Sequence, residues 1–72
     1  MIINGTIITP AQRYAGMSAM QGEFKRDTVF AALCAANVPW NAVRPATNRL
    51  IARECEIGRV RRLPGAKFQR VR

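Results

Sequence analysis

The chain has 72 residues, of which 49% are hydrophobic and 22% charged, and 12 Lys and Arg against 4 Asp and Glu give a net charge of +8. A chain of this length and composition forms one folded domain rather than a disordered segment. The absence of His removes the commonest acid–base group and metal ligand, and the excess of positive charge favours a polyanionic partner.

Cysteine content and hydrophobicity give an expected compartment. The two cysteines, Cys34 and Cys55, are fewer than a small secreted protein usually carries. The opening MIINGTIIT has no basic segment and no long apolar run of the kind found in signal peptides. No stretch approaches the roughly 20 apolar residues of a membrane span. We therefore expect a cytoplasmic protein with reduced thiols that does not bind a membrane.

The segment 1–9 is rich in β-branched residues around Asn4-Gly5, which is the strongest short signal for a β-hairpin. Its arms are too short to be stable alone. The alternative is a single strand with a kink at Asn4-Gly5, paired either with the C-terminal hairpin or with another subunit. The sequence leaves both pairings open.

A first helix is predicted over about 10–21. Thr9 can cap it, Pro10 suits its first position, Gln12 can complete a capping box, and Gly22 can end it. The spacing places an apolar strip on one face, made of Tyr14, Met17 and Met20. Because this strip has no obvious partner within the chain, it suggests a dimer surface.

A second helix is predicted over about 28–36, with Asp27 as its cap and Asn37 in the left-handed conformation after its end. Three- and four-residue spacing gives it a wide apolar face that should be central to the core. The residues of this face are Val29, Phe30, Leu33 and Cys34. Cys34 is expected to be a small buried residue.

The segment 38–44 predicts one or two helical turns that start near Pro39. Pro45 should stop this short helix, because proline disfavours a helical residue before it. A tight connection at 44–46 would follow. Trp40 is expected in the core, since a single Trp in so small a domain is more often buried than an exposed binding residue.

The last helix is predicted over about 48–56, capped by Thr47 and ended by Gly58. Its inward residues are Leu50, Ile51 and Cys55. Two strands, 59–63 and 66–71, should then form a hairpin around Pro64-Gly65 through a loop of three to five residues. Val60 and Phe68 are the expected inward residues of this hairpin.

This order of elements resembles the winged helix-turn-helix DNA-binding fold over about 27–72, with a strand and a helix in 1–22 preceding it. The stretch NRLIARECEIGRVRRLPGAKFQRV is similar to that family's passage from recognition helix into wing. The resemblance implies an α+β fold with a small helical core and a C-terminal β-hairpin. It also implies that helix 47–56 lies in the major groove and that hairpin 59–71 is a wing.

The charge distribution agrees with a nucleic-acid partner, because residues 44–72 hold nine Lys and Arg against two Glu. On the resemblance, the outward helix residues that reach base edges or phosphates are Asn48, Arg49, Ala52 and Arg53. The expected wing contacts are Arg59, Arg61, Arg62, Lys67 and Arg70. A solvated helix face is the alternative for the first group. The continuation of like charge into the hairpin favours polyanion binding.

Catalysis is not expected. Glu54 and Glu56 do not share a helix face, neither cysteine has a His to activate it, and two Cys without His cannot complete a zinc site. No cofactor is expected. The sequence therefore predicts a small sequence-specific protein that binds double-stranded DNA, such as a transcriptional regulator, with a homodimer left open. Its compact size suggests a bacterial, phage or plasmid protein.

The sequence is also compatible with two other functions. The first is a protein-interaction module, a small inhibitor or adaptor whose basic hairpin docks on an acidic protein surface. The second is RNA binding, which ranks lower because Phe68 is the one aromatic residue among the basic ones and is expected in the core.

Overall fold

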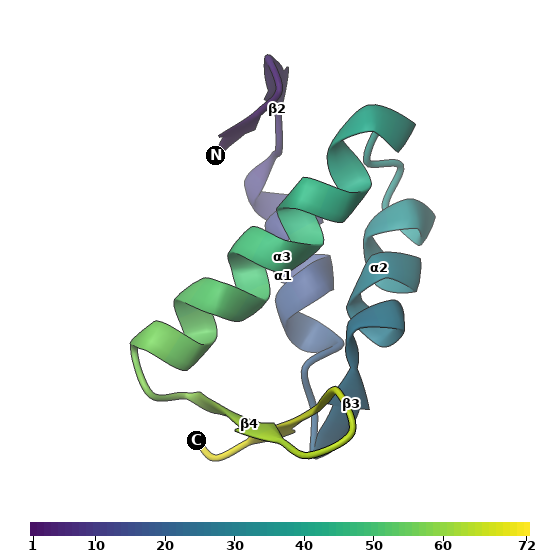
Figure 1. The fold of residues 1–72 in the computed structure, drawn as a ribbon. Helices are drawn as coiled ribbons and strands as arrows, with labels where there is room; N and C mark the ends of the chain where they lie inside the picture. Colours follow the sequence, from purple (N-terminus) through teal and green to yellow (C-terminus); the bar gives the residue numbers. More distant parts are fainter.

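The computed structural model describes all residues 1–72 as an α+β fold with three helices and two small antiparallel sheets (Figure 1). The elements are, in order, β1 Ile2–Ile3, β2 Thr6–Ile7, α1 Pro10–Ser18, β3 Glu23–Lys25, α2 Arg26–Ala35, α3 Trp40–Glu56, β4 Val60–Leu63 and β5 Lys67–Arg70. Strands β1 and β2 form one sheet and the order in the other is β3-β5-β4. The expected fold class, with a C-terminal hairpin, is confirmed.

The amino-terminal segment is a true hairpin, in which Ile2 lies opposite Ile7 and Ile3 opposite Thr6. Asn4 and Gly5 have φ of 50° and 78°, as a two-residue turn of type I′ requires. The hairpin signal is therefore confirmed. The alternative of a kinked single strand paired with the C-terminal hairpin is wrong, because β1 and β2 pair with each other.

Helix α1 starts as predicted, with a complete capping box in which the Thr9 hydroxyl accepts from the Gln12 amide. It ends at Ser18, earlier than predicted. Gly16 is buried where α1 packs against the other two helices. A Cβ at this position would lie 2.9 Å from Leu33 Cδ2 and from Leu50 Cδ1, so a larger residue would not fit without a shift. The predicted strip is divided, since Met20 is fully buried while Tyr14 is exposed, so its three residues do not form one exposed surface.

Strand β3 runs directly into α2, and this changes the predicted start of that helix. The helix begins at Arg26, Lys25 is its N-cap without a side-chain hydrogen bond, and Asp27 lies in the first turn. The expected cap at Asp27 is therefore wrong. Strand β3 was not predicted, because it is three residues long and its ordering comes from pairing with β5, where Phe24 lies opposite Phe68.

Helix α3 is continuous through Pro45, so the predicted stop and the tight connection at 44–46 are wrong. Proline has no N–H, which leaves the carbonyl of Asn41, four residues earlier, without its helical donor. The side-chain amide of Asn4, at the tip of the β1–β2 hairpin, donates to that carbonyl over 3.2 Å. A contact from a distant segment thus replaces the bond that Pro45 removes.

The core lies between the three helices and the inner face of the β3-β5-β4 sheet. Its fourteen buried hydrophobic residues include Val29 and Leu33 of α2, Leu50 and Ile51 of α3, and Val60. The rings of Phe24 and Phe68 stack with centroids 5.6 Å apart. Val60 and Phe68 point inward as predicted, and three residues, Pro64 to Ala66, join the two strands.

Two residues expected in the core lie on the surface. Trp40 is the first residue of α3, and it is 86% exposed. Cys34 is exposed near the end of α2, while the inward positions of that helix are Val29 and Leu33. Cys34 and Cys55 are both free thiols.

A buried carboxylate ties α3 to the sheet. Glu54 is 2% exposed, and its two oxygens accept from Arg59 over 3.1 Å and from Arg70 over 3.2 Å. Arg59 comes just before β4 and Arg70 ends β5. The helix end is therefore held to both strands of the C-terminal hairpin.

The Glu54 ion pairs predict a specific loss of stability. Glu54→Gln keeps the size of the side chain but removes the charge, so we expect it to lower the free energy of unfolding by about 2 kcal/mol. Glu56→Gln, at an exposed position of the same helix, should change it by less than about 0.5 kcal/mol. Urea unfolding measures both values, and equal losses would contradict the structural role of Glu54.

The replacement of the helical hydrogen bond at Pro45 by a contact from Asn4 predicts that restoring the helical bond will stabilise the chain. Pro45→Ala restores an N–H that can donate to the Asn41 carbonyl, and we expect the unfolding free energy to rise by about 1 kcal/mol or more. Asn4→Asp keeps a residue suited to the turn but removes the side-chain donor. It should destabilise the wild-type chain more than the Pro45→Ala chain, and additive effects in this double-mutant cycle would contradict this replacement.

Candidate nucleic-acid interface

One face of α3 is exposed along the whole helix. The four helix residues predicted to face outward, Asn48, Arg49, Ala52 and Arg53, are all exposed, and Leu50 and Ile51 are buried as expected. The exposed face also continues toward the helix start through Asn41 and Arg44, because α3 is longer than predicted.

The exposed residues of α3 divide between two flanks of the helix. Arg44 and Asn48 lie on the flank next to α2, where they line a groove with Arg26 and Phe30. Arg49 and Arg53 lie on the opposite flank, and Arg49 donates to the carbonyl of Ile2 in β1 over 3.4 Å. The four predicted contact residues therefore do not form one group.

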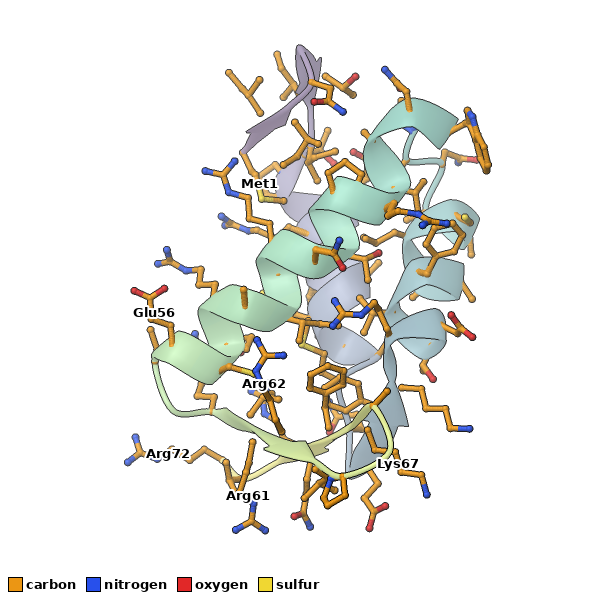
Figure 2. All side chains as sticks on the ribbon, viewed as in Figure 1. Met1, Glu56, Arg61, Arg62, Lys67 and Arg72 are labelled. Carbon is orange, nitrogen blue, oxygen red and sulfur yellow. The ribbon has the colours of Figure 1, made fainter.

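The basic residues of the β4–β5 hairpin divide between the two faces of the sheet. In the register, Arg62 lies opposite Phe68, whereas Arg61 lies opposite Gln69 and Leu63 opposite Lys67. Because cross-strand partners share a face, Arg62 lies on the inner face, and Arg61 and Lys67 lie on the outer face. Figure 2 shows Arg62 directed toward the end of α3 and Arg61 directed away from the helices.

Arg62 is part of a cluster that joins three elements. The guanidinium carbons of Arg62 and Arg26 lie 5.7 Å and 5.3 Å from the centre of the Phe68 ring. Arg26 also donates to the side-chain oxygen of Asn48. The cluster therefore connects the hairpin, the first turn of α2 and the exposed face of α3.

Two of the predicted DNA contacts have a structural task instead. Arg59 and Arg70 are 40% and 24% exposed at their side chains and both are paired with Glu54. Binding a phosphate through either guanidinium would weaken a pair with a buried carboxylate. Arg61, Arg62 and Lys67 are exposed and form no ion pair, so they stay available for a partner.

The groove beside α3 holds the residues that sequence reasoning missed. It has a volume of about 650 Å³ and is lined by Arg26, Asp27, Phe30, Arg44, Thr47 and Asn48. The sequence predicts Arg44 at the end of a short helix, because Pro45 is expected to stop it, and Arg26 before the second helix, because Asp27 is expected to cap that helix. Their charge was visible in the sequence, but their positions depend on the fold.

The surface as a whole is cationic and weakly neutralised. Of the twelve Lys and Arg side chains, only Arg59 and Arg70 form an ion pair. No three His, Cys, Asp or Glu side chains gather where they could hold a metal ion. None of the helices has the length and apolar character needed to cross a membrane.

Comparison of the chain with protein-family models, curated proteins and solved structures found no match.

The division of the hairpin's basic residues predicts different effects on folding. Arg70→Met leaves one oxygen of the buried Glu54 without its partner and should lower the unfolding free energy by about 2 kcal/mol. Lys67→Met, on the outer face of the same strand, should change it by less than about 0.5 kcal/mol. Thermal unfolding followed by circular dichroism measures both, and a stable Arg70→Met chain would argue that Arg70 is free for binding.

Proposed function

We propose that the chain binds double-stranded DNA, with α3 in the major groove and the β4–β5 hairpin as a wing against the adjacent backbone. The single observation that carries this proposal is the exposed surface that runs from α3 through the first turn of α2 to the hairpin, where three arginines outnumber one carboxylate, that of Asp27. Its members are Arg44, Asn48, Arg26 and Arg62, and they come from three different elements.

The arrangement of α2 and α3 supports the proposal. Four residues, 36–39, separate the two helices, as in a helix-turn-helix, and Asn37 has a φ of 65° in this turn. Helix α3 has 17 residues and is therefore about 25 Å long. Its exposed face carries no large apolar residue between Asn41 and Ala52, so the backbone can approach a groove wall closely.

The end of the chain also supports the proposal, because α3 is followed directly by the basic β4–β5 hairpin, as in the winged helix-turn-helix resemblance. Residues 59–72 contain six Lys and Arg and no acidic residue. Glu54 fixes the hairpin relative to α3, so both elements meet one duplex as a rigid unit.

Asn48 and Arg44 are the side chains proposed to read bases. Asparagine pairs with adenine, and arginine with guanine, through two hydrogen bonds each in the major groove. Asn48 accepts from Arg26 in the free chain, so on binding it would exchange this bond for a base while Arg26 turns to a phosphate. Arg49 and Arg53, on the other flank, are assigned to the opposite wall of the groove.

The DNA proposal is tested by selecting bound duplexes from a random pool and sequencing them. We expect an enriched motif that survives about 200 mM salt, and Asn48→Ala and Arg44→Ala should each weaken binding to that motif by about tenfold or more. Asn41→Ala, on the same helix face near its start, is the control for helix integrity. If Asn48→Ala and Arg44→Ala weaken binding to random DNA by the same factor as binding to the selected motif, Asn48 and Arg44 do not read bases.

The wing is tested by the salt dependence of binding. Arg61→Gln and Lys67→Gln should weaken binding to all duplexes alike and reduce the slope of log K against log salt by about one unit each. A slope unchanged by these substitutions would remove the outer face of the sheet from the interface.

The alternative of a protein-interaction module has one observation in its favour, which is the 86% exposure of Trp40 next to Arg44. An exposed Trp beside a cation fits a protein partner with an acidic rim. If the pool selects no motif and binding disappears with salt, Trp40→Ala should then abolish a complex with a purified acidic partner.

A further inference from the structure

The β1–β2 hairpin differs in charge from the rest of the chain. Residues 1–12 contain no charged side chain, although the chain has a net charge of +8. Ile2 and Ile7 lie opposite each other on the two strands and are 64% and 70% exposed. Figure 1 shows this hairpin at the opposite end of the molecule from β4. An apolar pair is thus exposed far from the cationic wing.

The hydrogen-bond pattern shows which backbone groups of the hairpin face outward. The Ile8 amide donates to the Met1 carbonyl over 2.7 Å, and Ile3 and Thr6 flank the turn. Narrow and wide pairs alternate in an antiparallel ladder, so Ile2 and Ile7 form the pair whose own N–H and C=O groups point away from the hairpin.

The two edges of the hairpin are not equivalent. On the β1 edge, the outward carbonyl of Ile2 accepts from Arg49 of α3, so the chain itself closes this edge. On the β2 edge, no side chain hydrogen-bonds to the backbone of Ile7. A strand edge that is uncharged, apolar and unpaired is a template for another strand, and proteins usually protect such edges with charges or proline.

We propose that the β2 edge pairs with the β2 edge of a second copy of this chain, in an antiparallel arrangement about a two-fold axis beside Ile7. Each Ile7 then exchanges two backbone hydrogen bonds with the partner's Ile7, the only register in which the outward groups of both strands meet. The joined sheet has four strands, and Ile2 and Ile7 of both copies form one row on the same face.

Charge favours a second copy over other occupants of this edge. A polyanion or an acidic protein would find no charged side chain on the β2 strand, because the cations nearest the hairpin, Arg49 and the Met1 ammonium, lie on the side of β1. Two chains of +8 repel each other less when they meet through a strand without charged side chains than through the basic β4–β5 hairpin. The apolar row is complementary to itself, as an interface between identical copies must be.

The proposal is tested first by sedimentation equilibrium from about 10 μM to about 1 mM protein. We expect a monomer–dimer equilibrium that tightens as salt rises from about 0.05 M to about 0.5 M, because salt screens the repulsion between the copies. This dependence is opposite in sign to that of DNA binding. A failure of the dimer therefore leaves the DNA proposal intact, and a failure of DNA binding leaves the dimer intact.

A matched pair of variants places the interface. Ile7→Lys puts two like charges opposite each other and should weaken the dimer by about tenfold or more. Val71→Lys adds the same charge at an exposed β-branched residue beyond β5 and should not weaken it by more than about twofold. Both sites are solvent-exposed, and unchanged thermal unfolding confirms that each variant is folded.

Cross-linking tests the register. Opposed Ile7 residues in the proposed pair have Cα atoms about 5.5 Å apart, which a disulfide can span. In a chain with Cys34→Ser and Cys55→Ala, Ile7→Cys should form a covalent dimer on mild oxidation and Val71→Cys should not. A wild-type chain that stays monomeric at all concentrations, a dimer unaffected by Ile7→Lys, or equal cross-linking of both cysteine variants would overturn the proposal.

Discussion

The position of the C-terminal hairpin depends on one buried carboxylate. Glu54 lies in the last turn of α3, and its two oxygens hold Arg59 before β4 and Arg70 at the end of β5. A buried charge is tolerated only when its partners are in place, so this ion cluster penalises any arrangement in which the hairpin leaves the helix. In a domain with a small hydrophobic core, such a penalty gives the hairpin a fixed orientation that packing of Val60 and Phe68 alone would specify less strictly.

The excess of positive charge therefore has two uses in the molecule. Two of the cations stabilise the fold, since Arg59 and Arg70 neutralise Glu54. The other Lys and Arg side chains have no ion-pair partner. The strand register separates the free cations further, with Arg62 beside α3 and Arg61 on the far face of the sheet. A count of basic residues overestimates the surface available to a polyanion, and the register shows which of them point together.

Local signals in the sequence predicted local structure well. The turn at Asn4-Gly5, the capping box of Thr9 and Gln12, and the inward positions of Val60 and Phe68 are all confirmed. Features that depend on distant contacts were not predictable. Pro45 continues a helix because Asn4, 41 residues earlier, supplies a donor nearby, and β3 is ordered by pairing with β5. The candidate interface combines both cases, since its outward α3 residues were foreseen while Arg26 and Arg44 required the fold.

The separation of charge along the molecule has a consequence for how it meets a charged partner. The turn of the β1–β2 hairpin and residues 28–43 carry no charged side chain, whereas the β4–β5 hairpin carries Arg61, Arg62 and Lys67 without an ion-pair partner. The local density of free positive charge is therefore higher at the β4–β5 hairpin than at the β1–β2 turn. A polyanion would be attracted more strongly to the β4–β5 hairpin, so encounters at that end of the molecule would be favoured.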